Sequence, residues 1–370
     1  MATLSNLERT ALRESLDRLL ADHAAEPDVR RVMETPSGYD PDLWRRLAEM
    51  GVVGLIIDED YGGSGAGPVE LEMVMESAGG ALLCGPLLAS GVLAAEFLRA
   101  LGDDAARSRL LPGVAAGTTI ATVAMTGDRG LWTADAVDVR ATKSGKTWRL
   151  DGVAGFVLHG QNADVILVVA NGPDGLGVFE IEPGAAGIDI EAMPTFDHTL
   201  RLARIKFDQA PTRRLDAQVP VWDAVRQALD LALVALAGEQ AGGARRCLDF
   251  TVDYARSRIQ FGRAIGSFQA IKHMAADLLL EAESATSAAR HAAERLAQNA
   301  PDAPAAISLA AFACADAFTA VTATSIQIHG GIAFTWVHPA HLYLRRARAD
   351  AQLFGTPPVH RERYLQALGG

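Results

Sequence analysis

The spacing of hydrophobic residues in the first third of the chain predicts amphipathic helices. Leucines recur at helical spacing through the first twenty residues, behind a Ser5 that suits a helix N-cap. Trp44 and Leu47 indicate a shorter helix that runs into a buried segment. A turn-rich loop follows at residues 58–67, and more helical pattern comes after it. We therefore expect an N-terminal α-helical domain over residues 1–118.

The period of the pattern changes in the middle of the chain. Arg201 and Arg204 interleave with hydrophobic neighbours, and Val165–Ala170 is a continuous, largely β-branched run. Turn signals separate the predicted strands, at Ser144–Gly145, at residues 171–175 and at Pro183–Gly184. No long helical pattern interrupts these strands. Residues 119–215 therefore predict an antiparallel β-barrel or sandwich and not a series of β-α-β units.

The last part of the chain, residues 216–370, is rich in alanine and again helical. Four long helices are expected, at about 219–258, 267–299, 303–329 and 339–352, with glycines or prolines between them. Alanine at the helix contacts predicts a close-packed four-helix bundle. The small residues of the middle two helices suit close neighbours and also an oligomer contact. Together the three parts predict an α+β multidomain protein.

Composition narrows the class of protein. The chain has 370 residues with 34 Lys and Arg against 45 Asp and Glu, a formal net charge of −11. This charge argues against a nucleic-acid-binding surface. Cys84, Cys247 and Cys314 are far apart, which excludes a disulfide framework, makes a metal site unexpected and fits a reducing compartment. The N-terminus has no apolar signal region, and Ala305–Ala313 is too short to span a bilayer, so we expect a cytoplasmic protein without a membrane span.

The common nucleotide and hydrolase motifs are missing from the sequence. No GxGxxG follows a predicted strand, and GxxxxGK[ST], GxSxG and HExxH do not occur. The Gly62–Gly67 run has enough glycines for a phosphate loop but lies between predicted helices. We interpret it as an ordinary loop. A Rossmann, P-loop or serine-hydrolase site is therefore not indicated.

Two long segments of the C-terminal part resemble the acyl-CoA dehydrogenase family. The first is YARSRIQFGRAIGSFQAIKHMAAD, from Tyr254 to Asp277; the second is QIHGGIAFTW, from Gln327, leading to HLYLRRA from His341. The segment GLIIDEDYGGSGAG at residues 54–67 is similar to the family's N-terminal loop. The order of helical, β and helical parts matches the family over essentially the whole chain. The resemblance implies an FAD-binding tetramer built as a dimer of dimers.

The same resemblance implies which residues contact FAD. Arg258 would hold the pyrophosphate of a neighbouring subunit's FAD, since a planar guanidinium matches phosphate oxygens. The other implied contacts run from the adenosine end through a backbone cradle to the flavin: Phe261 and Gln269, then Gln327, Gly330 and Gly331, then Thr126, Gly355 and Thr356. Each has an ordinary alternative. Arg258 could form surface ion pairs, Phe261 could pack in a core, and Gly330–Gly331 could simply end a helix.

The implied reaction is α,β-dehydrogenation of an acyl-CoA thioester, in which a carboxylate takes a proton from Cα while Cβ gives hydride to the flavin. The sequence departs from the family at both positions that carry this carboxylate. Phe354 stands directly before Gly355–Thr356, and Ala232 stands at the alternative position on the first C-terminal helix. Neither accepts a proton. Phe156-Val157-Leu158 replaces a Trp-x-Ser/Thr, so a flavin-facing hydroxyl is also lost.

One explanation is that another carboxylate of this chain serves as the base. Glu239 is the best candidate, because it lies about two helical turns beyond the alternative base position. Asp230 and Asp350 are weaker candidates. Glu239 could instead pair with Arg245 or Arg246, or lie at a subunit contact.

Two further explanations stay open. The chain could be half of a heterotetramer whose partner supplies the base, a type similar to actinobacterial enzymes for steroid-derived acyl-CoA. Alternatively, the site could serve chemistry without α-proton abstraction, such as desulfination, or be a non-catalytic structural homologue. We favour the heteromer, because both base positions and the hydroxyl are lost together. The resemblance also implies an acyl-CoA substrate and an electron-transferring flavoprotein as acceptor; Arg345 and Arg346 are open candidates for binding CoA.

Overall fold

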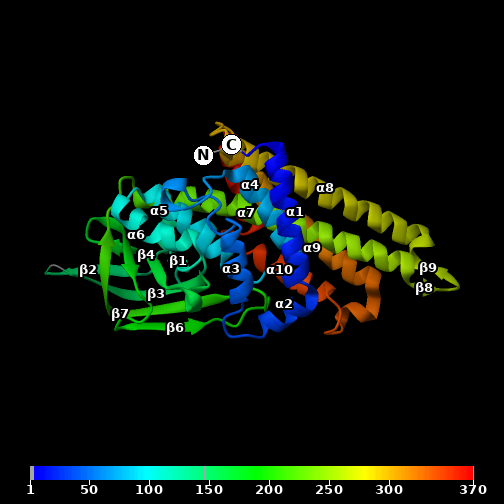
Figure 1. Cartoon of the computed structure of the whole chain (residues 1–370), viewed down its shortest axis with the longest axis horizontal. Helices are drawn as coiled ribbons and strands as arrows, with labels where there is room; N and C mark the ends of the chain where they lie inside the picture. The colour runs from blue at the N-terminus through cyan, green and yellow to red at the C-terminus, as the bar shows by residue number, and fades with distance from the viewer. Residues whose placement is uncertain (1–3, 146, 370) are drawn as a thin grey trace. The chain divides into compact units, whose positions relative to one another are not determined.

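The computed structural model describes residues 4–145 and 147–369, which form two compact units (Figure 1). The sheet unit comprises Val32–Gly67 and Cys84–Ala232; the helical unit comprises Leu4–Arg31, Pro68–Leu83 and Leu233–Gly370. Along the chain, helices precede residue 116, strands occupy residues 121–215, and helices follow. The expected order of helical, β and helical parts is confirmed. The division at residues 118 and 215 into three domains stays a prediction.

The N-terminal helices begin where the sequence places their caps. The Ser5 hydroxyl accepts a hydrogen bond from the Glu8 amide, and the Glu8 carboxylate accepts one from the Ser5 amide at 2.8 Å, which forms a capping box. The Asp40 carboxylate caps the third helix by accepting hydrogen bonds from the Asp42 and Leu43 amides. The α-helices of this part are α1 (Asn6–His23), α2 (Glu26–Met33), α3 (Pro41–Glu49), α4 (Pro68–Gly80), α5 (Ala95–Leu101) and α6 (Asp104–Ala115).

The segments between these helices are also ordered. Residues 58–67 hold only a short 3-10 turn, Glu59–Tyr61. A Cβ atom on Gly63 would overlap the backbone of Ile57, so that glycine is required by the packing of the loop itself. The interpretation of this glycine-rich run as an ordinary loop agrees with this contact. A π-helix, Leu87–Ala94, is buried along its whole length and runs directly into α5.

The strands of the sheet unit form one seven-stranded sheet. They are β1 (Ala121–Ala124), β2 (Arg140–Ser144), β3 (Thr147–Leu158), β4 (Val165–Gly172), β5 (Gly175–Ile181), β6 (Ile188–Ala192) and β7 (Leu202–Leu215). The order is β1-β4-β2-β3-β7-β5, with β6 on β7, and β5 also pairs with β4, so the hydrogen-bonded order returns on itself. Leu150, Ile166, Phe179 and Ile205 lie in the core of this sheet.

The expectation of a wholly antiparallel arrangement needs one correction. β1 runs parallel to β4, with Ala121 opposite Val165, and β2 meets β4 in parallel where Arg140 faces Asn171. A parallel pair needs a long crossover. Here the β2–β3 hairpin lies within that crossover in place of a helix, so the sequence between the two strands shows no helical pattern.

The C-terminal helices follow the predicted spans closely. They are α7 (Val221–Ser257), α8 (Gln269–Ala297), α9 (Ala303–His329) and α10 (Ala340–Asp350), and an unexpected fifth helix, α11 (Pro357–Ala367), ends the chain. A two-stranded hairpin, β8 (Ile259–Gln260) and β9 (Arg263–Ala264), connects α7 to α8. Buried alanines such as Ala285, Ala289 and Ala310 let α8 and α9 pack closely.

Within the helical unit, α4 and α7 cross with their backbones in contact. A Cβ atom on Gly242 would overlap the carbonyl oxygen of Glu76, and one on Gly79 would overlap that of Glu239. A Cβ atom on Gly238 would lie 2.6 Å from the Glu72 carbonyl oxygen. The three glycines therefore permit an approach that any larger residue would prevent.

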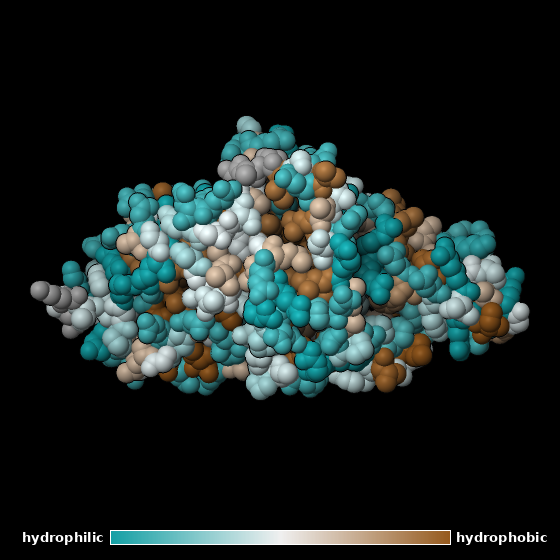
Figure 2. All heavy atoms as spheres, in the orientation of Figure 1, coloured by the Kyte–Doolittle hydropathy of each residue, from teal (hydrophilic) through white to brown (hydrophobic). Residues whose placement is uncertain are grey.

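Among the described residues, one helix is long and apolar enough to span a membrane by length and composition. It is α9 with the turn that follows, Ala303–Phe334. Because 67% of its most apolar 18-residue stretch is buried within the protein, we interpret it as a core helix. On the face drawn in Figure 2, hydrophilic residues dominate and hydrophobic atoms form only small separate groups.

Candidate functional site

The ends of α7 and α9 lie side by side at one end of the helical unit. The Tyr254 ring stacks on the His329 ring with 4.3 Å between centroids, and the Tyr254 hydroxyl donates to the His329 carbonyl at 3.4 Å. One turn earlier, the Thr251 and Ser325 hydroxyls are 2.6 Å apart. These contacts bring the β8–β9 hairpin and the Gly330–Gly331 turn, which the sequence separates widely, to the same end of the unit.

Arg258 connects α7 to the hairpin, and its guanidinium is available to bind another molecule. Its amide donates to the Tyr254 carbonyl at 2.8 Å, and its carbonyl accepts from Ile265 at 2.8 Å, so the backbone is fixed. Its side chain is exposed and forms no ion pair with the described residues. Phe261, at the hairpin turn, is 91% exposed with a φ of 54°. Phe261 is thus not a core residue of this chain.

The other predicted residues at this end are also exposed. Gln269 is the first residue of α8, with its amide 2.9 Å from the His273 imidazole, and Gln327 lies on the open side of α9. Gly330 ends α9 with φ 66° and ψ −144°, so its glycine is required by the backbone. A Cβ on Gly331 would meet nothing within 4 Å. The chain's own packing therefore gives no reason for glycine there, which fits the close approach of another molecule.

A crevice of about 210 Å³ opens between the ends of α7, α8 and α9. Its walls are mainly apolar, with Ala255, Ile271 and Ile328 among them, and Arg256 and Lys272 add positive charge. An apolar slot with cations beside it suits a molecule that combines an aromatic ring with anionic groups.

In the sheet unit, the Thr126 side chain already has a hydrogen-bond partner. Thr126 is buried, its hydroxyl donates to the Gly155 carbonyl at 2.6 Å, and its carbonyl accepts from the Gly155 amide at 2.9 Å. This pairing fixes the backbone before Phe156, which has a positive φ of 54°. The hydroxyl of Thr126 thus stabilises the sheet, and Phe156 offers no replacement hydroxyl.

Neither of the family's base positions carries a proton acceptor. Phe354 is buried with φ 59°, and Gly355 follows with φ 122°. A Cβ on Gly355 would lie 3.0 Å from Nε2 of His360, so the turn is tightly packed. Thr356 is the N-cap residue of α11, and its side chain makes no capping hydrogen bond. Ala232, at the alternative position, is fully buried.

Glu239, the candidate base within this chain, forms a buried ion pair. Its carboxylate accepts from the Arg346 guanidinium, and the side chains are 9% and 5% exposed. Arg346 also donates to the Leu83 carbonyl at 3.4 Å. Glu239 is thus in an ion pair, but its partner is Arg346 and not Arg245 or Arg246 as expected. The sequence leaves Arg346 open as a candidate for binding CoA. In the structure its side chain is buried within the helical unit.

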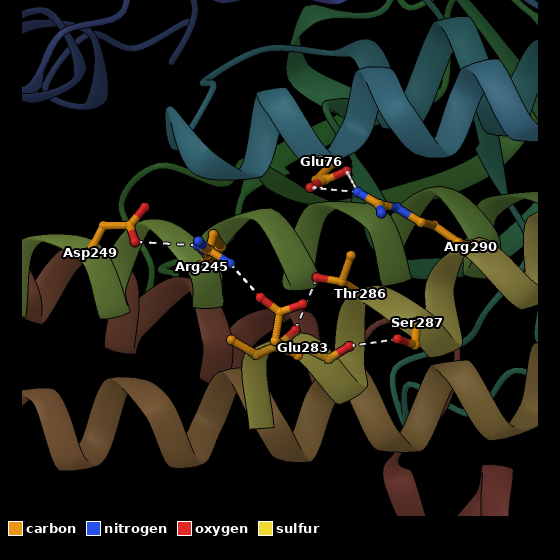
Figure 3. A network of polar contacts seen from close by, with 8 residues as sticks. Glu76, Arg245, Asp249, Glu283, Thr286, Ser287 and Arg290 are labelled. Atoms are coloured by element: carbon orange, nitrogen blue, oxygen red, sulfur yellow. Dashed lines mark hydrogen bonds and ion pairs between the residues drawn. The ribbon is translucent and has the colours of Figure 1, made fainter. Parts of the chain in front are cut away.

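Arg245 belongs to a separate network on the surface of α7 and α8 (Figure 3). It donates to Asp249 at 3.3 Å and to Glu283 at 2.6 Å. Further along α8, Arg290 contacts the Glu76 carboxylate of α4 at 3.3 Å. These pairs join α4, α7 and α8 at a half-exposed surface, and exposed pairs of this kind add little stability individually.

A larger cavity of about 680 Å³ lies elsewhere in the helical unit, between α1, α4, α7 and α10. Leu20, Phe250 and Leu342 contribute apolar wall, and Arg246 contributes charge. The hydroxyl of Tyr343 donates to the Gly80 carbonyl at 2.7 Å, and burial raises the pKa of Tyr343. No sequence motif marks this cavity, because its residues come from four separate segments.

Glu72 and His360 are among the buried side chains of the helical unit whose pKa values are strongly shifted. Burial, and after it the charge of the neighbouring Glu76 carboxylate, raises the pKa of Glu72 to about 7. Burial lowers the pKa of His360 to about 4, with the positive charge of Arg363 as a second cause. His360 is therefore neutral near pH 7, and Glu72 keeps its proton in about half of the molecules at that pH.

The family follows from comparison with known proteins. Residues 6–118 match the acyl-CoA dehydrogenase N-terminal domain, and residues 222–369 match the acyl-CoA dehydrogenase C-terminal domain. The chain is 36% identical over 361 residues to the acyl-CoA dehydrogenase IpdE2 of Mycolicibacterium smegmatis, covering 97% of this chain and 98% of that protein. This chain belongs to the acyl-CoA dehydrogenase family. As an acyl-CoA dehydrogenase it is a flavoprotein oxidoreductase of lipid metabolism.

Solved structures of acyl-CoA dehydrogenases share the fold over nearly the whole chain. A variant of the Tcur3481–Tcur3483 steroid acyl-CoA dehydrogenase is 30% identical with a TM-score of 0.88, covering 98% of both chains. The ChsE4–ChsE5 complex from Mycobacterium tuberculosis is 27% identical with a TM-score of 0.89, covering 100% of this chain and 99% of that chain. Each of these names joins two protein names, and the second is described as a complex.

Proposed function

We propose that this chain is one subunit of an FAD-dependent acyl-CoA dehydrogenase that introduces a Cα=Cβ double bond into an acyl-CoA thioester. A related partner subunit supplies the catalytic base. The observation that supports this proposal is that the chain keeps the family's cofactor-binding residues but lacks its catalytic base. The exposed Arg258 and the open glycine turn at Gly331 retain the cofactor-binding pattern, while Phe354 and Ala232 fill both base positions with side chains that accept no proton.

The residues at the hairpin end of the helical unit fit the outer part of a neighbouring subunit's FAD. The Arg258 guanidinium suits the pyrophosphate oxygens, and Gly331 leaves room for backbone contact. Phe261, Gln269 and Gln327 offer an aromatic face and two amides to the adenosine side. When bound, FAD accepts the hydride from Cβ. The role of this chain is to bind and orient that cofactor across a subunit interface, within a dimer of dimers.

Glu239 is the alternative source of a base. To accept a proton from Cα it would have to leave the Arg346 guanidinium, and its departure would leave a buried positive charge without its partner. A base on the partner subunit needs no such rearrangement. The two-chain names of the Tcur3481–Tcur3483 and ChsE4–ChsE5 structures support the heteromeric arrangement.

The proposed substrate is a bulky, steroid-derived acyl-CoA, in line with the steroid acyl-CoA dehydrogenase among the similar structures. Reduced flavin would pass its electrons to an electron-transferring flavoprotein. A non-catalytic assembly protein is the competing function, and it would use the same surface without turning over substrate.

The test is to purify the chain alone and after co-expression with a related subunit encoded beside it. Native mass spectrometry should find two chain types and two flavins per tetramer. Adding the acyl-CoA without oxygen should bleach the flavin of the complex. A homotetramer that bleaches alone would contradict the partner's role, and a flavin-loaded complex that no acyl-CoA bleaches would favour the assembly protein.

A further inference from the structure

Two histidines enclose the turn that carries Gly330 and Gly331. His329 is the last residue of α9, and His338 lies just before α10. Their rings are in contact, with 4.4 Å between centroids and 58° between planes. The Phe250 ring of α7 lies against both, at 5.7 Å from His329 and 6.3 Å from His338. The segment between the two histidines is thus closed at its base by an imidazole pair.

The backbone fixes the proton on each ring. Nδ1 of His329 lies 2.8 Å from the Ser325 carbonyl, which can only accept, so this nitrogen carries hydrogen. Nδ1 of His338 accepts from the Ala340 amide at 3.2 Å, so this nitrogen carries none. A second proton on His338 would have to bind at Nδ1. It would break the hydrogen bond to Ala340, the first residue of α10.

The surroundings also favour neutral rings. Burial lowers the pKa of both His329 and His338, and each ring in turn faces another imidazole. Arg30 of α2 and His341 of α10 oppose a charge on His338, while Glu26 of α2 favours one. On the α7 side His329 faces the neutral rings of Phe250 and Tyr254. A cation on His338 would also lie at the N-terminus of α10, where the helix dipole is unfavourable to it.

We propose that the His329–His338 pair positions the Gly330–Gly331 turn for cofactor binding and releases it when His338 is protonated, so that flavin retention falls in mildly acidic solution. The contact joins His329, directly before the glycines, to His338, which accepts a hydrogen bond from the amide at the start of α10. Two charged rings, or one charged ring without its Ala340 contact, would separate these ends. The inference rests on the proposed function, because it requires the cofactor to use this turn.

Flavin dissociation from the full complex at about pH 7.5 and about pH 5.5 tests the proposal. The wild type should lose flavin at least about threefold faster at the lower pH. In His338→Asn the side-chain oxygen can still accept from Ala340 but cannot take a proton, so the two rates should be nearly equal. His338→Ala should lose flavin faster at both values. His291→Asn, an exposed histidine of α8, should keep the wild-type pH dependence.

Hydrogen–deuterium exchange of residues 326–340 in the same proteins, corrected for intrinsic rates, separates this inference from the proposed function. Exchange should rise at the lower pH in the wild type and in His291→Asn, and stay level in His338→Asn, whether or not flavin is bound. A protein without flavin but with this pattern would reject the proposed function alone. Equal pH dependence of exchange and of flavin loss in wild type and His338→Asn would overturn the role of the pair.

Discussion

The carboxylate of Glu239 and the guanidinium of Arg346 form an ion pair inside the helical unit, 107 residues apart in sequence. Arg346 also reaches the carbonyl of Leu83, at the segment that follows α4. The pair therefore connects α7, α10 and the end of α4. Because both charges are removed from water, each one depends on the other.

Loss of Arg346 should be more damaging than loss of the whole pair. Arg346→Met leaves the Glu239 carboxylate buried alone and should lower the free energy of unfolding by about 3 kcal/mol. The double variant Glu239→Gln with Arg346→Met should recover most of that loss. Urea unfolding of the two single variants and the double variant measures the coupling. Additive effects of the two substitutions would show that the pair is energetically unimportant.

Glu239→Gln also tests the alternative base. With the base on a partner subunit, the complex should bleach with acyl-CoA at a rate within about twofold of wild type, since removing a general base costs roughly 10²–10⁴-fold. Single-turnover absorption measurements give this rate. A fall of about a hundredfold or more would assign the base to Glu239 and reject the heteromeric explanation.

Arg258→Ala should reduce the flavin content of the purified complex. A guanidinium bound to phosphate contributes about 1.5–3 kcal/mol, so FAD should bind roughly ten- to a hundredfold more weakly. The matched control is Arg348→Ala, at an exposed position of α10. Titration of the deflavinated complex with FAD measures both. Equal affinity in the two variants would contradict the role of Arg258.

Two glycine substitutions should separate folding from cofactor binding. Gly242→Ala places a methyl group against the Glu76 carbonyl and should destabilise the protein by about 3 kcal/mol or more, because helix backbones would have to separate. Gly331→Ala meets no atom of the chain, so stability should change by less than about 0.5 kcal/mol while flavin content falls. Thermal unfolding and absorption spectra report the two effects. Full flavin content in Gly331→Ala would argue against a cofactor at this turn.

Because of Glu72, stability should fall as pH rises from 4.5 to about 7. Its pKa is about 7 in the folded protein and 4.5 unfolded, so the folded state holds the extra proton between these values. The penalty of ionisation is absent below pH 4.5 and complete above pH 7, where it reaches about 3 kcal/mol. Glu72→Gln should remove this slope, and Glu281→Gln, on the exposed side of α8, should keep it. Urea unfolding at several pH values provides the comparison. A slope unchanged in Glu72→Gln would place the cause in another group.

The sequence predicted those features that depend on neighbours along the chain. The capping box at Ser5 and the limits of α7 to α9 follow from local pattern, as does the position of Gly330 at a helix end. The family motifs identified Arg258 and the glycine turn as one group, and the contact of Tyr254 with His329 brings their segments together.

The features that were missed depend on segments far apart in sequence. The parallel pairing of β1 with β4 joins strands about forty residues apart, and hydrophobic spacing does not encode strand direction. In the sequence, Arg346 has the pattern of a residue on an ordinary charged helix surface. Only the fold shows that it pairs with Glu239. Gly242 sits in a run of small residues, and only the position of α4 shows that its lack of a side chain is required.

The empty space around the Cβ position of Gly331 has a consequence for mutational screening. A survey that scores only how well each variant folds or accumulates would classify this position as freely replaceable. It would classify substitutions of Gly79, Gly238 and Gly242 as damaging. Under the proposed function, the constraint on Gly331 comes from the bound cofactor. It becomes visible only when the assay measures what the assembled protein holds.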